Sequence, residues 1–262
     1  MFLDEPISIL VTGGTGSFGK AFINKLVNDF TNIKRLVIFS RDELKQYLMK
    51  SQFKSDDKIL RYFIGDVRDL DRLKLAMQDV NIVIHAAALK HVESGEYNPF
   101  EVVKTNVVGT QNVVDAIVGS RVEKAIFLST DKAAYPINAM GMSKALMEKV
   151  ALSKSLLKQN STTVCVTRYG NVIGSRGSVI PFFKKLIKER SKYLPITDKK
   201  MTRFTITLKE AVDFVIHCLH ILLTTHSCQS VVSQQFVLHQ NLVIHHLLLV
   251  GISFSHHLVN FQ

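Results

Sequence analysis

Short apolar runs alternate with longer amphipathic runs along most of the chain. The apolar runs predict strands at 7–12, 35–40, 60–65, 81–86, 124–129 and 163–168. The amphipathic runs predict helices at 20–28, 43–51, 70–77, 100–118 and 139–157. Because the two kinds of run alternate, they indicate βαβ units and a parallel sheet. We therefore expect an α/β fold with a Rossmann-like, doubly wound parallel sheet.

The pattern stops after about Leu219. From His220 to Gln262 there is no Asp, Glu, Lys or Arg, and this stretch holds seven of the ten histidines. A membrane-associated segment and a His-rich metal tract are alternatives. However, His and Ser interrupt every apolar run before about 18 residues, and the histidine spacing repeats no ligand pattern. We expect 220–262 to be an irregular uncharged tail, of the kind that a shifted reading frame or a truncated gene produces.

The formal net charge of +11 would suit an anionic partner. Basic residues are scattered and no nucleic-acid motif is present, so a solvated basic surface is preferred over nucleic-acid binding. An anionic small molecule such as a nucleotide fits the charge equally well. Three cysteines without a CxxC predict neither a disulfide framework nor a zinc site. With no signal peptide and no membrane span, the sequence predicts a cytoplasmic enzyme without a metal.

Three glycines lie between the first strand and the first helix, in the order Gly13-x-x-Gly16-x-x-Gly19. Such a turn brings backbone N–H groups close to a pyrophosphate, although a simple tight turn is the alternative. The second strand ends in Ser40-Arg41-Asp42, where an Arg favours a 2′-phosphate. We therefore expect NADP as the cofactor. NAD is the alternative, because Asp42 lies close to the same strand end, and Arg41 could instead be an ordinary surface charge.

Several motifs occur in order: "TGGTGSFG", "FSRDE", "GDVRD", "HAAALKHV", "KTNVVGTQNV", "LSTDKAAYPINAMGMSKALMEK", "TRYGNVIGSRGSVIPFF" and "ITDKKMTRF". Together they closely resemble the inverting UDP-N-acetylglucosamine 4,6-dehydratases, extended short-chain dehydrogenase/reductase enzymes of bacterial surface-glycan pathways. The run "AYPINAMGMSK" looks most like the capsule-biosynthesis members. The resemblance covers about residues 5–219. It implies an NAD(P)-binding Rossmann domain at 5–165 and the start of an incomplete small substrate lobe, completing the sheet, at 166–219.

The resemblance also implies a reaction. The sugar C4 hydroxyl is oxidised, water is lost across C5 and C6, and hydride returns to C6. Lys132 is then the base at C5, Asp131 the acid at the C6 oxygen and Thr130 a hydrogen-bonding partner of the C4 oxygen. A lysine base must be substantially neutral, which requires a lowered pKa. The alternative for this pair is a surface ion pair at a strand end.

The same resemblance assigns binding residues. The cofactor set is Gly13, Thr15, Gly16, Ser17, Phe18, Gly19, Ser40, Arg41, Asp66, Val67, Ala86, Ala87, Ala88, Lys90, Asn106, Lys144 and Tyr169. The UDP-N-acetylglucosamine set is Lys90, His91, Asn171, Arg176, Ser178, Val179, Thr197, Met201 and Arg203, with Pro181, Phe182 and Thr202 nearby. A homo-oligomer is a further expectation from the family. His85, which ends a buried strand, is expected to be a packed core histidine.

Two departures from the family pattern stand out. Short-chain dehydrogenases usually carry Tyr-x-x-x-Lys, whereas this chain has Met140-x-x-x-Lys144, and a thioether has no proton to exchange. The resemblance to capsule-type members extends to this Met, which indicates a divergent site in which Lys132 or water assists C4 oxidation. The second departure is the tail from residue 220, which puts UDP-sugar binding in doubt. The alternatives are an inactive NADP-binding fragment and a nucleotide-sugar 4-epimerase.

Overall fold

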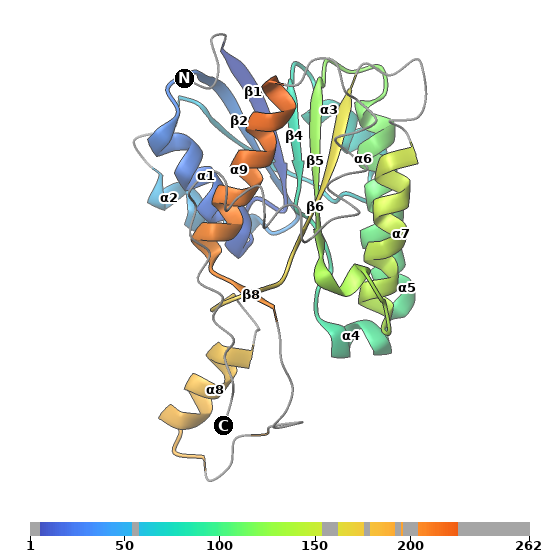
Figure 1. The fold of residues 1–262 in the computed structure, drawn as a ribbon. Coiled ribbons are helices and arrows are strands. Elements are labelled where there is room, and N and C mark those ends of the chain that lie inside the picture. Colours follow the sequence, from blue (N-terminus) through green and yellow to red (C-terminus); the bar gives the residue numbers. More distant parts are fainter. Residues whose placement is uncertain are drawn as a thin grey trace.

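The computed structural model describes residues 6–53, 58–153, 162–175, 179–191, 195 and 204–224. Its main sheet is six-stranded, in the order β3-β2-β1-β4-β5-β6 (Figure 1). Every neighbouring pair of these strands is parallel. The strands are β1 (Ile7–Thr12), β2 (Ile33–Ser40), β3 (Leu60–Ile64), β4 (Ile82–His85), β5 (Lys124–Thr130) and β6 (Thr163–Tyr169). This is the doubly wound order, in which the direction of winding reverses between β1 and β4.

Helices connect the strands. They are α1 (Ser17–Asp29), α2 (Glu43–Gln52), α3 (Leu70–Ala76), α4 (Val92–Tyr97), α5 (Pro99–Val103), α6 (Gly109–Ile117) and α7 (Ala139–Ser153). A π-helical segment, Lys104–Val108, joins α5 to α6, so the long helix expected at 100–118 contains a wider turn. The six predicted strands are confirmed with their ends shifted by at most two residues. The short helix α4 was not predicted.

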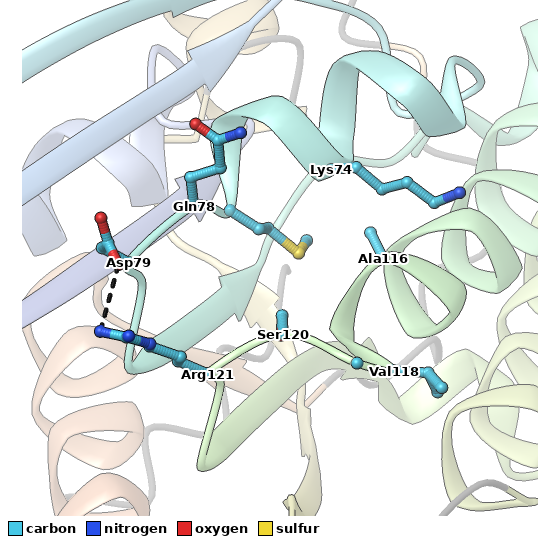
Figure 2. A pocket seen from close by; sticks show the side chains of 9 residues that line it. Lys74, Gln78, Asp79, Ala116, Val118, Ser120 and Arg121 are labelled. Carbon is cyan, nitrogen blue, oxygen red and sulfur yellow. Dashed lines mark ion pairs between the residues drawn. The ribbon is translucent and has the colours of Figure 1, made fainter.

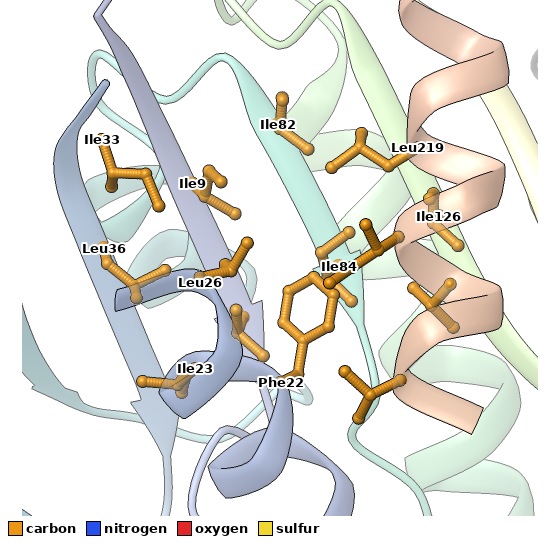
Figure 3. Close-up of a cluster of buried hydrophobic side chains, with 14 of the residues drawn as sticks. Ile9, Phe22, Ile23, Leu26, Ile33, Leu36, Ile82, Ile84, Ile126 and Leu219 are labelled. Carbon is orange, nitrogen blue, oxygen red and sulfur yellow. The ribbon is translucent and has the colours of Figure 1, made fainter. Parts of the chain in front are cut away.

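Side chains alternate between the two faces of the sheet, because successive strand residues point to opposite sides. One buried cluster includes Ile9, Leu36 and Ile126 from the strands and Phe22 from α1 (Figure 3). The other includes Leu10 and Phe127 from the strands, together with residues of α3, α6 and α7. The sheet is therefore a middle layer between two helical layers, and its strands are apolar on both faces.

The chain leaves the sheet after β6 and then returns to it. Strands β7 (Asn171–Val172) and β8 (Thr205–Ile206) form a small parallel pair, and α8 (Val179–Lys188) lies between them in the sequence. Helix α9 (Leu208–Thr224) then packs against α1 and the last two strands of the large sheet. In Figure 1 it crosses the face of the sheet beside α1.

Helix α9 continues past Leu219, where the sequence led us to expect the ordered pattern to stop. Leu222 is fully buried in the cluster that α9 forms with α1. The uncharged stretch therefore begins as part of a core helix, because its first residues keep an apolar face toward the sheet. The rest of the predicted tail, 225–262, lies outside the described residues. Within the described ranges, no helix is long and apolar enough to cross a membrane.

A shallow groove of about 500 Å³ lies between the end of α3 and the turn that follows α6 (Figure 2). Its lining includes Lys74, Gln78, Val118 and the ion pair between Asp79 and Arg121. These residues precede β4 and β5, so the groove lies at the amino end of the strands. None of the predicted site residues lines it.

Candidate active site

The predicted site residues within the described ranges gather at the carboxyl ends of the strands. The glycine turn follows β1, Arg41 follows β2 and Asp66 follows β3. The Ala86–Ala88 loop follows β4, and Asp131 and Lys132 follow β5. Ligands of doubly wound folds bind in the crevice at this edge, where the winding reverses.

The glycine turn is shaped by close contacts of the backbone. Gly13 has φ +66°, and a Cβ there would lie 2.9 Å from the backbone N of Ala87. A Cβ on Gly19 would lie 2.5 Å from Cα of Gly14, so α1 begins pressed against the turn. Gly16 is the residue before α1, and no side chain caps this helix end. The first N–H groups of α1 therefore point toward the carboxyl edge, an arrangement that suits a pyrophosphate.

His85 ends β4 and is buried in a defined tautomer. Thr110 donates its hydroxyl hydrogen to the backbone O of Asn106 at 2.7 Å, so its oxygen accepts from Nε2–H of His85 at 3.1 Å. Nδ1 of His85 is then an acceptor, 2.8 Å from the hydroxyl of Thr12. Burial, with a smaller contribution from the charge of Lys144, lowers the pKa of His85 to about 3. The prediction of a packed core histidine is confirmed.

The loop after β4 is held from both sides by buried polar groups. The hydroxyl oxygen of Thr12 accepts hydrogen bonds from the backbone N of Ala86 and Ala87, at 3.1 and 3.2 Å. The side chain of Asn106, which is fully buried in the π-helical segment, accepts from the N of Leu89 and donates to its O. This loop therefore has a fixed backbone beside the glycine turn, where the predicted cofactor residues Ala86, Ala87 and Ala88 lie.

The ends of β2 and β3 carry charged side chains. Arg41 is half exposed, and its guanidinium lies 3.4 Å from the carboxylate of Asp66. The carboxylate of Asp66 pairs mainly with Arg68, at 2.7 Å. Burial of Asp66 raises the pKa of its carboxyl, but the hydrogen bonds from Arg68 lower that pKa to a value below the ordinary one. Asp42 accepts from the N of Lys45 at 2.9 Å and so caps α2. Arg41 is thus the more available of the two residues for a ligand at the end of β2.

A tight cluster follows β5. The hydroxyl of Thr130 donates a hydrogen bond to Oδ1 of Asp131 at 2.7 Å. The ammonium of Lys132 donates to the same carboxylate oxygen, Oδ1, at 3.1 Å. That ammonium also donates to Oδ1 of Asn171 at 2.8 Å. Asp131 and Lys132 are both partly exposed, with side chains 16% and 28% exposed. The two side chains form an ion pair at the strand end, and Thr130 and Asn171 add hydrogen bonds to it.

Helix α7 places Met140 and Lys144 on its buried side. Met140 is 5% exposed. The ammonium of Lys144 donates to the backbone O of Leu128 at 2.8 Å. Burial lowers the pKa of Lys144 to about 8, and the negative charge of Glu148 opposes that shift. The helix begins close to the cluster of Thr130, Asp131 and Lys132, because a Cβ on Gly141 would lie 2.6 Å from the backbone O of Lys132.

Two aromatic side chains of the predicted cofactor set lie together. The rings of Phe18 on α1 and Tyr169 at the end of β6 stack with centroids 6.4 Å apart. Burial raises the pKa of the Tyr169 phenol, so it keeps its proton at all ordinary pH values. Tyr169 is paired in register with Thr130, which brings this part of the predicted cofactor set next to the cluster of Thr130, Asp131 and Lys132.

The structure brings together most of the predicted residues but not all. Lys90 and His91 lie exposed between β4 and α4. Arg176, Ser178, Thr197, Met201, Thr202 and Arg203 fall outside the described residues, as does the side chain of Val179. The sequence analysis missed the buried cluster of Ser129, Glu148 and Arg168. A Glu at a buried position of α7 was the available signal.

Fold and site together define a Rossmann-like α/β protein with a glycine turn of the dinucleotide-binding kind. The family described as polysaccharide biosynthesis protein matches residues 9–234. The chain belongs to this family.

Of two curated relatives, the first confirms the resemblance inferred from the motifs, and the second bears the name of an epimerase. Over 210 residues the chain is 55% identical to the inverting UDP-N-acetylglucosamine 4,6-dehydratase of Campylobacter jejuni, covering 80% of this chain and 62% of that relative. Over 220 residues it is 50% identical to a UDP-glucose 4-epimerase of Rickettsia rickettsii, covering 83% of this chain and 63% of that relative. The chain thus spans less than two thirds of the length of these relatives.

Solved structures share the fold. Pen from Bacillus thuringiensis is 41% identical, with a TM-score of 0.78, over 84% of this chain and 66% of that chain. The dTDP-glucose 4,6-dehydratase DesIV from Streptomyces venezuelae is 22% identical, with a TM-score of 0.74, over 82% of this chain and 72% of that chain. The second likeness concerns the fold alone.

Proposed function

We propose that the chain carries the catalytic centre of an NADP-dependent, C5-inverting UDP-N-acetylglucosamine 4,6-dehydratase of capsule or surface polysaccharide synthesis. The observation that carries this proposal is the hydrogen-bonded cluster of Thr130, Asp131 and Lys132 at the carboxyl end of β5. The 55% identical relative bears the same activity in its name. An acid, a base and a hydroxyl within one cluster meet the needs of an elimination of water.

The turn after β1 supports a dinucleotide cofactor. A Cβ at Gly13 would fill the space against Ala87, and the N-terminus of α1 has no side-chain cap. The exposed guanidinium of Arg41 suits a 2′-phosphate and supports NADP over NAD, whereas the DesIV structure holds NAD. When bound, the nicotinamide supplies a hydride acceptor for the C4 hydrogen and a hydride donor for C6.

The residues of the chain would then divide the proton transfers. The hydroxyl of Thr130 binds the C4 oxygen, the neutral amine form of Lys132 takes the C5 proton, and the protonated form of Asp131 gives its proton to the departing C6 hydroxyl, which leaves as water. Lys144 binds the nicotinamide ribose. Asp131 and Lys132 are in contact at 3.1 Å, so the proton that the base removes at C5 has a short path back to the acid at C6.

Met140 occupies the position where many related enzymes have a tyrosine. Met140 is buried, and its Cβ would lie 3.9 Å from a Cβ placed on Gly95 of α4. A thioether cannot accept the C4 proton. In this proposal a water molecule accepts it, or Lys132 accepts it and passes it to the Asp131 carboxylate in contact with it, so that the amine is neutral again for the C5 step. Met140 contributes only packing between α7 and α4.

A second candidate is a nucleotide-sugar 4-epimerase, which the name of the 50% identical Rickettsia relative favours. An epimerase needs a group that takes and returns the C4 proton, and it has no use for an acid and base pair at C5 and C6. The third candidate is an inactive member of the family that binds NADP without turnover.

The test is product identification. Purified protein is incubated with UDP-N-acetylglucosamine and NADP, and the sugar is followed by NMR and mass spectrometry. A 6-deoxy-4-keto sugar supports the dehydratase, a 4-epimer supports the epimerase, and cofactor binding without product supports the inactive reading.

A further inference from the structure

Three polar side chains from three elements meet beneath the proposed site. Ser129 comes from β5, Glu148 from α7 and Arg168 from β6. The Glu148 side chain is 3% exposed and that of Arg168 is 17% exposed. None of the three has a place in the proton transfers proposed above, and none belongs to the predicted binding sets.

Every bond in this cluster converges on the carboxylate. Oε1 of Glu148 accepts from the hydroxyl of Ser129 at 2.5 Å and from Nε of Arg168 at 2.7 Å. Oε2 accepts from Nη2 of Arg168, which completes a two-bond pairing of guanidinium and carboxylate. Ser129 and Arg168 are register partners in the sheet. Glu148 therefore joins α7 to two adjacent strands at one level.

The cluster of Ser129, Glu148 and Arg168 lies next to the residues proposed to react. Ser129 directly precedes Thr130, and Arg168 directly precedes Tyr169. Glu148 is one helical turn from Lys144, whose ammonium binds the backbone O of Leu128 in β5. The cluster thus anchors the part of α7 that carries Lys144 to the strand ends that carry the catalytic cluster.

The start of α7 is anchored separately. Gly141 lies against the backbone of Lys132 so closely that a Cβ would come within 2.6 Å of its O. The N of Gly141 also binds Oδ1 of Asn138 at 2.8 Å. Lys144 lies between these two anchor points, so the position of its ammonium relative to Lys132 depends on both.

We propose that Ser129, Glu148 and Arg168 form a positioning unit that holds Lys144 in register with Asp131 and Lys132. Glu148 acts through Lys144 and does not touch the substrate. The inference rests on the proposed function for its catalytic readout but not for its cofactor-binding readout. A buried ion pair is weak evidence for stability in itself, because apolar residues of similar size often replace such a pair without loss. The placement of this pair between the reacting elements is what indicates positioning.

The test compares Glu148→Gln with the double variant Glu148→Leu/Arg168→Met in the full chain. Glu148→Gln removes the charge at nearly constant shape, and the double variant removes the whole pair without leaving an unpaired charge. The matched control is Asp71→Leu/Lys74→Met, which removes an exposed pair on α3 with a distance of 3.9 Å. Each protein is measured for its urea midpoint, its NADP affinity by calorimetry, and its kcat and KM for UDP-N-acetylglucosamine.

We expect the double variant to unfold at the same urea midpoint as the wild type. Its kcat should still be at least about tenfold below that of the wild type, because small misplacements of reacting groups slow a reaction strongly. KM should stay within about twofold of the wild-type value. NADP affinity should fall about fivefold because Lys144 is displaced, which is the typical effect of losing one aligned hydrogen bond. The control should match the wild type in all four measurements.

If kcat and NADP affinity return to wild-type values in the stable double variant, the cluster is structural only and the positioning role is wrong. If the wild type makes no dehydrated product but NADP affinity still falls in both Glu148 variants and not in the control, the proposed function fails while the positioning unit stands. If the wild type is inactive and affinity is also unchanged, both fail.

Discussion

The ammonium of Lys132 donates a hydrogen bond of 2.8 Å to Oδ1 of Asn171, which lies on a strand outside the main sheet. Nδ2 of Asn171 donates to the backbone O of Phe204 at 3.2 Å, and this contact fixes which end of the amide faces the lysine. The proposed base is therefore oriented by the first residue of β7, in the small β7–β8 pair. This hydrogen bond joins the segment that follows β5 to the small strand pair.

Asn171→Ala should lower turnover about tenfold while the protein stays folded. The variant removes the acceptor that orients Lys132, and an aligned hydrogen bond to a charged group contributes about 1.5–3 kcal/mol. The backbone N of Asn171 still donates to Phe204 O at 2.8 Å, so the small strand pair should persist. Steady-state kinetics with circular dichroism provide the measurement. Unchanged kcat in the folded variant would show that Lys132 needs no partner there.

Lys132→Met should reduce product formation on the order of 10²–10⁴-fold, the usual contribution of a positioned acid or base. NADP affinity should stay near the wild-type value, because the glycine turn and Arg41 are untouched. The matched control is Lys74→Met, an exposed lysine beside the groove at the opposite end of the strands. Turnover within twofold of the wild type in Lys132→Met would remove Lys132 from the mechanism.

Arg41→Ala should weaken NADP binding about tenfold and leave NAD binding nearly unchanged. The reason is that the guanidinium is proposed to bind only the 2′-phosphate, and a charge-assisted bond is worth roughly 1.5–3 kcal/mol. Asp66 keeps its stronger partner, Arg68, at 2.7 Å, so the end of β3 should not rearrange. Calorimetric titration with both cofactors is the measurement. An equal loss for NADP and NAD would argue against a 2′-phosphate contact.

Gly13→Ala should cost at least about 2 kcal/mol of unfolding free energy and abolish cofactor binding, because the new Cβ meets the backbone of Ala87 at 2.9 Å. Gly119→Ala is the matched control. Gly119 also has a positive φ, +78°, but a Cβ there meets nothing within 4 Å. It should cost only the backbone strain, about 1 kcal/mol. Equal costs in urea unfolding would mean that the close approach is unimportant.

His85 should make the protein sensitive to acid. Its pKa is about 3 when folded against an ordinary 6.5, so between these values the unfolded chain binds the extra proton and stability falls as pH falls. By pH 4 the loss should reach about 3 kcal/mol. His85→Gln cannot take up this proton, so the stability difference between wild type and variant should shrink from pH 7 to pH 4. A constant difference would mean that His85 titrates normally.

Much of the sheet could be predicted from the sequence because parallel strands buried on both faces read as unbroken apolar runs. The run at 7–12 is an example, and its bounds match β1. Helix α4 was missed because its six residues are too few for a helical period to be visible. Helix α9 was not among the predicted helices. Its last turn was assigned to the tail because charge content, which changes at residue 220, was weighted above the apolar face that carries Leu222 into the core.

Some residues of the candidate site could likewise be proposed from the sequence, whereas others are revealed only by the structure. Asp131 and Lys132 could be proposed from the sequence because they directly follow a strand, in one short motif that resembles the family. The contacts of Glu148 with Ser129 and Arg168 span 19 and 20 residues. No spacing rule links an α7 residue to two strands, so only the packed structure reveals that cluster. Asp42 looked like a ribose ligand by position, whereas its carboxylate caps α2.

The most direct test of the account follows the C4 hydrogen itself. UDP-N-acetylglucosamine deuterated at C4 is incubated with the protein and NADP, and the label is located by NMR. The account predicts a 6-deoxy-4-keto product that carries the deuterium in its C6 methyl group and a solvent proton at C5. Deuterium that remains at or returns to C4, with the C6 hydroxyl intact, would contradict it.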